Sequence, residues 1–225
     1  MSDKAVCLCS GGLDSTVAAT IARRSGMDVY LIHVCYGQQA ERREVESVRR
    51  IASAIGASDL MLSTLDLFRD LSALTTRGAR IPRGVEVSLD SGSTPPTWVY
   101  CRNTVLLSMA AAYAEYLGAE SIYVGFNAEE AMSYPDNRPE FVERFNALLE
   151  RAVASFSRPP KVVAPLVDMR KNEIVRLGTE IKAPLELTWS CYLDGEIHCG
   201  TCESCQHRRR GFMEAGVPDP TGYLQ

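Results

Sequence analysis

Apolar and polar positions follow one another along the chain in blocks typical of strands that alternate with helices. Residues 5–9 and 29–34 are nearly continuous apolar runs, as expected of strands that are buried on both faces of a parallel sheet. Over residues 39–55 the apolar side chains recur at helical spacing between charged residues, and Gly56 ends the pattern. We expect this charge run to be a solvated helix face.

The same alternation continues toward the C-terminus and sets the fold class. It predicts helices at 14–25, 103–117, 141–156 and 172–181, and strands at 59–62, 121–125 and 161–164. This order is typical of an α/β fold with a doubly wound, mostly parallel sheet. We expect one α/β domain over residues 1–185 and a C-terminal segment over residues 186–225 that packs on it.

One long stretch, residues 75–97, lacks sustained periodicity and is rich in glycine and proline. A loop of this length inside a domain is usually a lid or a binding loop, or it is disordered. We expect a mobile lid.

Composition and charge narrow the classes of protein. The chain has 225 residues, of which 46% are hydrophobic and 23% charged, and this ordinary balance argues against disorder. The 24 Lys and Arg residues against 28 Asp and Glu residues give a net charge of −4, which does not favour direct nucleic-acid binding. No apolar run is long enough to span a membrane, and the N-terminus lacks the pattern of a secretory signal. We therefore expect a cytoplasmic protein.

The first strand is followed by a loop suited to phosphate, Ser10-Gly11-Gly12-Leu13-Asp14-Ser15. Its two glycines allow the backbone N–H groups to approach a ligand at the start of the next helix. A carboxylate beside phosphate oxygens needs a cation, and Mg²⁺ bound by Asp14 would provide it. The alternative from the residues alone is a plain Gly-Gly turn in which Asp14 caps the helix.

This S-G-G-x-D-S pattern resembles the pyrophosphate-binding loop of the ATP-pyrophosphatase superfamily, whose fold is of the adenine nucleotide alpha hydrolase-like type. The resemblance implies cleavage of ATP to AMP and pyrophosphate, with adenylation of an acyl or carbonyl oxygen. It implies ATP-binding residues at Cys9, Ser10, Gly11, Gly12, Leu13, Asp14, Ser15, Thr16, Val17, Ala18 and Ala19.

Four of the eight cysteines lie close together near the C-terminus, at Cys191, Cys199, Cys202 and Cys205. Two overlapping C-x-x-C units with a further thiol are typical of a closed, structural zinc site with one ion per chain. An iron–sulfur cluster is the rival interpretation, although the next cysteine of the ferredoxin run is replaced by Arg209. The other four cysteines are expected to be small core side chains.

Nearly the whole chain resembles the 7-cyano-7-deazaguanine synthase family. The resemblance rests on an ordered set of motifs, which comprises the S-G-G-L-D-S loop, Tyr36-Gly37-Gln38, Arg102-Asn103, Gly125-Phe126-Asn127-Ala128, Tyr134-Pro135-Asp136-Asn137-Arg138-Pro139-Glu140-Phe141, Pro165-Leu166, Lys171 and Thr188-Trp189-Ser190-Cys191 before the cysteine cluster. It implies a ligase that uses ATP, Mg²⁺ and ammonia to convert 7-carboxy-7-deazaguanine into its nitrile, on the route to queuosine or archaeosine in tRNA modification.

The resemblance also implies roles for individual residues. Asp14, Ser15 and Lys171 would be catalytic, with Asp14 on Mg²⁺ and Lys171 neutralising phosphate charge. The deazaguanine pocket would be formed by Tyr36, Arg102, Asn103, Asn127, Tyr134, Asp136 and Arg138. The chain departs from the family pattern at Asn137, where a cysteine is usual, and at Tyr100-Cys101 before Arg102.

Other functions are compatible with the same sequence. A related ATP-pyrophosphatase could amidate or thiolate another base or a tRNA, and the basic run Arg208-Arg209-Arg210 would be a helix face, a phosphate contact or an RNA platform. A non-catalytic, zinc-stabilised nucleotide-binding adaptor is a further alternative, which the intact Asp14 and Ser15 disfavour. The chain could act as a homodimer.

Overall fold

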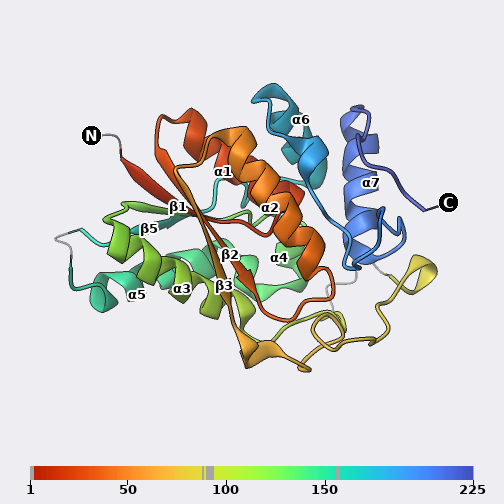
Figure 1. The fold of residues 1–225 in the computed structure, drawn as a ribbon, viewed down its shortest axis with the longest axis horizontal. Helices are drawn as coiled ribbons and strands as arrows, with labels where there is room; N and C mark the ends of the chain where they lie inside the picture. Colours follow the sequence, from red (N-terminus) through yellow and green to blue (C-terminus); the bar gives the residue numbers. More distant parts are fainter. Residues whose placement is uncertain (1–2, 88, 90–93, 156–157, 225) are drawn as a thin grey trace.

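A five-stranded parallel sheet forms the centre of the protein, in the order β3-β2-β1-β4-β5 (Figure 1). The computed structural model describes residues 3–87, 89, 94–155 and 158–224. The strands are β1 Lys4–Leu8, β2 Asp28–Cys35, β3 Asp59–Thr64, β4 Ser121–Tyr123 and β5 Lys161–Val163. The parallel α/β class predicted from the alternating pattern is confirmed.

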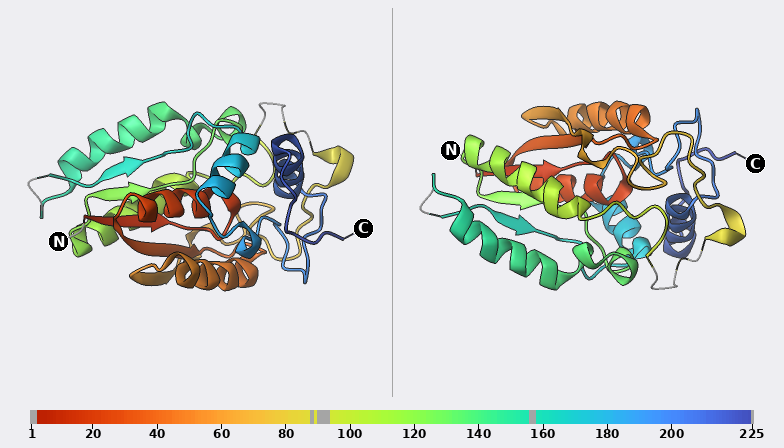
Figure 2. Two further views of the ribbon diagram at one scale, coloured as in Figure 1. Left: turned by 90° about the horizontal axis from the view of Figure 1, so that it is seen from above. Right: turned by 90° about the horizontal axis from the view of Figure 1, so that it is seen from below.

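Helices cover both faces of the sheet (Figures 1 and 2). Alternate residues of β1 point to opposite faces, so Cys7 packs in one hydrophobic cluster with α1 and α2 while Val6 packs in another with α3 and α5. A further cluster joins α6 and α7 to α1. These helices are α1 Leu13–Arg24, α2 Glu41–Ile55, α3 Arg102–Leu117, α5 Pro139–Ala152, α6 Lys171–Glu180 and α7 Glu203–Ala215.

The order of the strands creates a switch point between β1 and β4. From β1 the chain proceeds to β2 and β3 on one side of the sheet, and β4 and β5 lie on the other side. The loops that leave β1 and β4 therefore diverge at the carboxyl edge of the sheet, where open α/β sheets bind their ligands.

Most element boundaries lie near those that the sequence predicts, with three clear differences, the first being that the predicted helices do not include α7. The helix predicted at 141–156 ends earlier, with α5 at Ala152, and Phe156 lies outside the described residues. The pattern does not predict α4, Glu130–Ser133, because four residues are too few to show a helical period.

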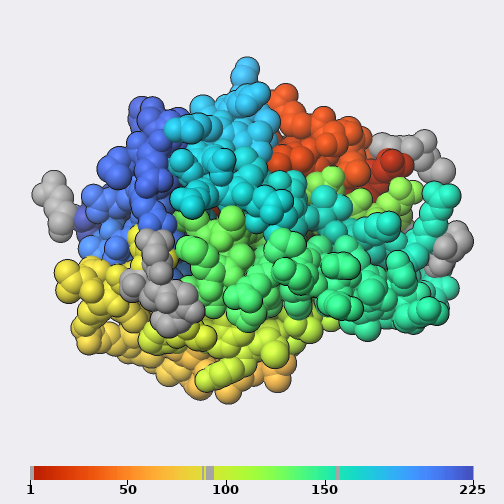
Figure 3. All heavy atoms as spheres, turned by 180° about the vertical axis from the view of Figure 1, so that it is seen from behind, coloured from red at the N-terminus to blue at the C-terminus, as the bar shows by residue number. Residues whose placement is uncertain are grey.

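Part of the predicted lid packs against the C-terminal segment (Figures 2 and 3). Ile81 is buried among the four clustered cysteines, and Arg83 forms an isolated antiparallel bridge with Cys202. The backbone N–H of Gly84 donates to the carbonyl of Thr201 at 2.8 Å. Residues 88 and 90–93 of the predicted lid lie outside the described residues, and lid motion stays a prediction.

The C-terminal segment packs on the α/β core. Phe212 on α7 shares a hydrophobic cluster with Leu13 on α1 and Ile174 on α6. Arg208, 1% exposed, forms an ion pair with Asp219. The boundary between residues 185 and 186 stays a prediction. No helix in the described part of the chain has the length and apolar character needed to cross a bilayer.

Candidate active site

A cleft of about 230 Å³ opens at the carboxyl edge of the sheet, beside the switch point. Its walls come from the loops after β1, β2 and β4, the first turns of α3 and α6, and the C-terminal segment. Most of the motif residues that the sequence analysis singled out lie on or next to these elements.

The loop after β1 presents backbone and hydroxyl groups to this cleft. Gly11 has a φ of +80°, and an added Cβ would lie 3.0 Å from both the Glu44 carbonyl oxygen and the Ser47 Cβ. The hydroxyls of Ser10 and Ser15 lie 3.1 Å apart. Gly12 is the N-cap of α1 and no side chain caps this helix end, so the alternative in which Asp14 caps the helix is wrong.

Within the stretch predicted to bind ATP, only part faces the cleft. Cys9, Ser10, Gly12, Leu13, Asp14 and Ser15 line it. Thr16, Val17, Ala18 and Ala19 are buried in α1, where the Thr16 hydroxyl donates to the Gly12 carbonyl at 2.7 Å. These four residues support the loop through their packing inside the protein and do not face the cleft.

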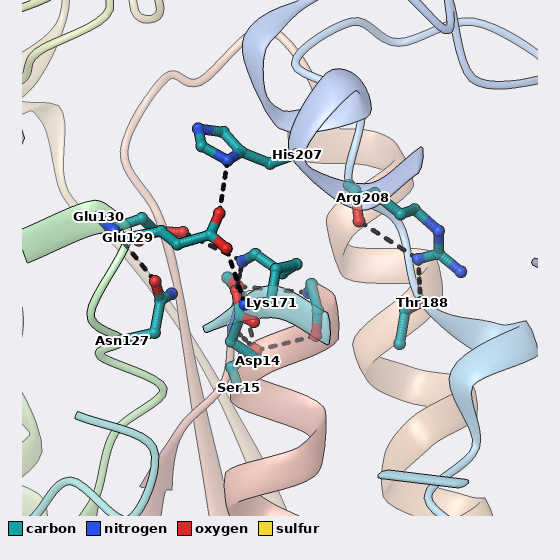
Figure 4. A network of polar contacts seen from close by, with 12 residues as sticks. Asp14, Ser15, Asn127, Glu129, Glu130, Lys171, Thr188, His207 and Arg208 are labelled. Carbon is teal, nitrogen blue, oxygen red and sulfur yellow. Dashed lines mark hydrogen bonds and ion pairs between the residues drawn. The ribbon is translucent and has the colours of Figure 1, made fainter. Parts of the chain in front are cut away.

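Asp14 and Lys171 form a buried ion pair at the centre of the site (Figure 4). The Lys171 Nζ lies 2.6 Å from Asp14 Oδ2 and 3.5 Å from Glu130 Oε1. Burial opposes the charged form of Lys171, but the carboxylates of Asp14 and Glu130 outweigh it and hold the pKa of Lys171 above its ordinary value. Oδ1 of Asp14 is buried and has no hydrogen-bond partner among the described residues.

Glu129 connects this pair to α7 (Figure 4). Its Oε1 accepts from the Lys171 backbone N–H at 3.0 Å. Its Oε2 lies 3.0 Å from His207 Nδ1 and 2.9 Å from the Arg210 guanidinium. Burial alone would raise the pKa of Glu129, but these donors outweigh burial and hold that pKa well below its ordinary value.

The loop after β4 packs directly on the start of α1. A Cβ added at Gly125 would lie 2.6 Å from the Ser15 backbone nitrogen and 2.7 Å from the Asp14 carbonyl carbon. Because both of these are backbone atoms, only glycine permits this close approach. The contact fixes the two ligand-facing loops of the switch point against each other.

An aromatic and a cationic side chain form a wall of the cleft between the end of β2 and the start of α3. The Arg102 guanidinium donates to the Tyr36 hydroxyl at 3.1 Å, and both residues line the cleft. Burial opposes the charge of Arg102, but Tyr36 and Asp136 outweigh it and hold the pKa of Arg102 above its ordinary value. The neighbouring Asn103 also lines the cleft.

Of the remaining residues predicted to bind the substrate, some line the cleft and others stabilise the elements that form it. Tyr134 lines the cleft, and so does Asn137, the position at which the chain departs from the family pattern. Asp136 does not line it, and its Oδ2 accepts from the Asn103 backbone N–H at 3.3 Å. Asp136 therefore supports the start of α3.

Asn127 and Arg138, both described residues, also do not line the cleft. Asn127 is 0% exposed, and its Oδ1 accepts from the Glu130 backbone N–H at 3.0 Å, at the start of α4. The Arg138 side chain is exposed and donates to the Ala131 carbonyl at 3.0 Å. Both side chains thus stabilise the loop after β4 from outside the cleft.

The four C-terminal cysteines come together as the sequence predicts. Their sulfur atoms all lie within 4.8 Å of one another, and all four residues are buried. The sulfurs of Cys199 and Cys205 are 3.9 Å apart. Backbone N–H groups donate to sulfur at Cys191 and Cys199, at 3.3 to 3.4 Å. Such a cluster can hold a metal ion.

Among the cleft-wall residues that escape the sequence analysis are five with polar or charged groups, Glu129, Glu130, Tyr192, Glu203 and His207. Two of them have a signal in the sequence, because Tyr192 directly follows Cys191 and Glu203 directly follows Cys202. A cysteine that is held in the buried cluster also restricts the position of the residue next to it. The other three are placed by contacts between distant segments.

The basic run 208–210 lies on α7, as the helix-face interpretation expects, and each described guanidinium has a partner. Arg208 pairs with Asp219, and Arg210 pairs with Glu129. Arg209 donates to the Gly200 carbonyl at 3.3 Å. The guanidinium groups of the run 208–210 therefore contact other parts of the protein.

Comparison with known proteins gives a match along nearly the whole chain. The family model described as "Queuosine biosynthesis protein QueC" matches residues 4–216. The chain is 88% identical over 220 residues to the 7-cyano-7-deazaguanine synthase of Methanothrix thermoacetophila, with 98% of each chain covered. It is 44% identical to the 7-cyano-7-deazaguanine synthase of an Anaeromyxobacter species, with 99% of this chain and 97% of the relative covered.

Solved structures with distant sequences share the fold. A U34-tRNA thiolase, NcsA, from Methanococcus maripaludis with its 4Fe-4S cluster matches with a TM-score of 0.52 and 14% identity, over 82% of this chain and 59% of the thiolase. An NMN synthetase from Francisella tularensis matches with a TM-score of 0.51 and 13% identity, over 96% of this chain and 79% of the synthetase. The predicted ATP-pyrophosphatase type of fold is thereby confirmed.

Proposed function

The chain belongs to the QueC family of queuosine biosynthesis proteins, and we propose that it is a ligase that makes 7-cyano-7-deazaguanine from 7-carboxy-7-deazaguanine, ammonia and ATP. The observation that carries this proposal is the 88% identity to a curated 7-cyano-7-deazaguanine synthase over 98% of both chains. A cleft at the switch point of the sheet, with an intact S-G-G-x-D-S loop, supports it.

The reaction proceeds by two successive adenylations, each on a different oxygen atom of the substrate carboxylate. The substrate carboxylate attacks the α-phosphorus of ATP, which releases pyrophosphate and leaves an acyl adenylate. Ammonia displaces AMP and loses a proton, which gives the amide. The amide oxygen then attacks the α-phosphorus of a second ATP, which releases pyrophosphate and one N–H proton. The resulting adenylate loses AMP and its remaining N–H proton to give the nitrile. Each nitrile therefore requires two ATP molecules and releases two AMP and two pyrophosphate molecules.

The residues of the cleft fit this chemistry. We assign pyrophosphate to the backbone N–H groups and hydroxyls of the Ser10 to Ser15 loop, at the uncapped start of α1. Mg²⁺, held by the buried and unpartnered Oδ1 of Asp14, would supply charge neutralisation at the phosphates. Lys171 would add positive charge where negative charge develops on the α-phosphate.

The deazaguanine pocket is assigned to the part of the cleft that Tyr36, Arg102 and Tyr134 line. Arg102 provides a half-buried positive charge beside Asn103. Asn137 lines the same wall with an amide that can both donate and accept, so a polar heterocycle can still be bound there.

We propose that the cysteine cluster holds one structural zinc ion. A tetrahedral site with Zn–S bonds of about 2.3 Å has sulfurs separated by about 3.8 Å. The 3.9 Å between the Cys199 and Cys205 sulfurs fits a single ion better than a cluster of several iron atoms, which would hold the thiolates farther apart. With four thiolate ligands, no position is open for water or substrate, so the ion would support the fold rather than the chemistry.

The free base, rather than a tRNA, is the substrate that we propose for a cytoplasmic enzyme. The described arginines of the run 208–210 contact Asp219, Gly200 and Glu129, which argues against an open RNA platform on α7. The intact Asp14–Lys171 pair argues against a non-catalytic adaptor.

The proposal is tested by incubating the purified protein with 7-carboxy-7-deazaguanine, ATP, Mg²⁺ and ammonium, and by analysing the products by mass spectrometry. We expect the nitrile, and we expect no product when ATP or ammonium is omitted. A folded, metal-loaded protein that gives no nitrile, under conditions in which ATP binding is demonstrated, would exclude the proposed function.

A further inference from the structure

The carboxylate of Glu203, at the start of α7, lies in the cleft wall, and no lysine or arginine of the described residues pairs with it. Oε2 of Glu203 accepts hydrogen bonds from the hydroxyls of Thr97, Tyr134 and Tyr192, each at 3.3 Å. No ion pair joins Glu203 to a lysine or arginine within the described residues. Long hydrogen bonds to neutral hydroxyls compensate a largely buried carboxylate only in part, so it retains the capacity to accept stronger donors.

The carboxylates near the Asp14–Lys171 pair are already engaged. Asp14 and Glu130 both face the Lys171 ammonium. Glu129 accepts from the Lys171 backbone N–H and pairs with Arg210. The carboxylate on α7 differs from these three because neutral hydroxyls are its donors.

Aromatic rings flank Glu203. Tyr134 stacks on Trp98, with ring centroids 5.7 Å apart and planes inclined by 22°. Tyr134 and Tyr192 both line the cleft, and both donate to the same carboxylate oxygen. A wall of flat rings around an acceptor is suited to a planar heterocycle that stacks on the rings and donates from its edge.

The cysteine cluster holds this wall in place. Cys191 directly precedes Tyr192, and Cys202 directly precedes Glu203. The sulfurs of both cysteines belong to the buried cluster. The chain positions from which the tyrosine and the carboxylate extend into the cleft are therefore fixed by the same cluster.

On the basis of the function proposed above, we propose that Glu203 recognises the deazaguanine ring by accepting hydrogen bonds from its ring N–H and its exocyclic amino group. These two donors are parallel and adjacent, which matches the two oxygens of a carboxylate. Asp136, the acid that the sequence analysis places in this pocket, has its oxygens near the Asn103 N–H at 3.3 Å and the Asn137 amide nitrogen at 3.4 Å. Glu203 is thus the recognition residue on the cleft wall.

The test compares two bases and two variants. The bases are 7-carboxy-7-deazaguanine and the analogue that lacks the exocyclic amino group, 7-carboxy-7-deazahypoxanthine. For the natural protein we expect a kcat/KM about tenfold or more in favour of the amino-bearing base, which corresponds to about 1.4 kcal/mol. Glu203→Gln places an amide N–H opposite the donor edge, so we expect KM for the base to rise roughly 10- to 100-fold and the preference to disappear.

Two controls separate recognition from folding. KM for ATP should stay within about twofold in Glu203→Gln, since the residue is assigned to the base and not to the nucleotide. Glu214→Gln changes an exposed carboxylate on the same helix and should behave like the natural protein. Metal content and melting temperature are measured for both variants.

The outcomes are distinct from those that test the proposed function. A natural protein that makes the nitrile, together with a Glu203→Gln variant that keeps the KM and the preference, would overturn the recognition role alone. If the variant loses its metal or unfolds, calorimetric binding of the two bases to the natural protein decides, and equal affinity would overturn the proposal. A protein that prefers the amino-bearing base but makes no nitrile would retain the recognition role and lose the function.

Discussion

The Nζ atom of Lys171 lies 2.6 Å from Oδ2 of Asp14, although 157 positions separate the two residues in the sequence. Lys171 begins α6 and Asp14 lies in the first turn of α1, and both residues line the cleft beside the switch point of the sheet. The second carboxylate oxygen of Asp14, Oδ1, is buried and has no hydrogen-bond partner among the described residues. Because Oδ2 is paired with Lys171 and Oδ1 is not paired, Oδ1 is the oxygen that would bind a cation that accompanies ATP.

Removing the ammonium group of Lys171 should nearly abolish turnover. Lys171→Met leaves the Asp14 carboxylate buried without its ammonium and removes positive charge from the α-phosphate, so we expect kcat to fall by about 10²-fold or more. Lys161→Met, at an exposed position on β5, is the matched control and should keep normal turnover. Steady-state release of AMP measures both variants. Turnover of Lys171→Met within a few-fold of the control would remove Lys171 from the chemistry.

A single methyl group at Gly125 should disturb the nucleotide loop. In Gly125→Ala the new Cβ would lie 2.6 Å from the Ser15 backbone nitrogen, so one of the two loops must move. We expect destabilisation of about 1–3 kcal/mol and weaker ATP binding, measured by denaturant unfolding and calorimetry. Gly222→Ala is the control, since its Cβ would meet Ile197 at an ordinary 3.9 Å. Unchanged ATP affinity in Gly125→Ala would show that this contact does not position the loop.

Loss of one thiolate should release the metal and loosen the C-terminal segment. In Cys202→Ala we expect the zinc content to fall from about one ion per chain to near zero and the melting temperature to fall by roughly 10 °C or more. Cys101 lies outside the cluster and is exposed, so the expectation that it is a core side chain is wrong, and Cys101→Ser should retain the metal. Elemental analysis and thermal unfolding give the readout. Iron in place of zinc in the natural protein would refute the single-zinc assignment.

The stabilising effect of Glu129 should depend on pH. Its pKa is held below the ordinary value in the folded protein, so its contribution to stability is fully present above the unfolded-state pKa, near 4.3, and is lost as the pH falls through the lower folded-state pKa. We therefore expect Glu129→Gln to lower the free energy of unfolding at pH 7 by about 1–3 kcal/mol.

Urea unfolding at several pH values measures this effect. The difference between Glu129→Gln and the natural protein should narrow only below about pH 4. Glu150→Gln, at an exposed position on α5, should show no such difference. If the difference in unfolding free energy between the two proteins stays constant down to the lowest pH measured, the ionisation of Glu129 does not contribute to stability.

Features encoded by short stretches of sequence are predicted well. The strand predicted at 29–34 is observed as Asp28–Cys35, and the helix predicted at 103–117 is observed as Arg102–Leu117. The four cysteines converge because their spacing already limits how far apart they can lie. In these cases the pattern and the structure both depend on neighbouring residues.

Features that depend on distant segments are not predicted. The sequence analysis gives Asp14 and Lys171 separate tasks, whereas their direct contact depends on how the whole sheet places α1 against α6. Asp136 and Arg138 belong to a motif next to the cleft, but the turn before α5 directs them away from it. Glu203 lines the cleft instead, because it directly follows Cys202 of the cysteine cluster at the start of α7.

The most direct test of the account follows the oxygen atoms of the substrate carboxylate. The natural protein is incubated with 7-carboxy-7-deazaguanine that carries heavy oxygen in its carboxylate, together with ATP, Mg²⁺ and ammonium, and the AMP and nitrile are quantified by mass spectrometry. Two adenylations at one site predict two AMP molecules per nitrile, each with one heavy oxygen atom on its phosphate. AMP without the label, or ADP as the nucleotide product, would contradict this account.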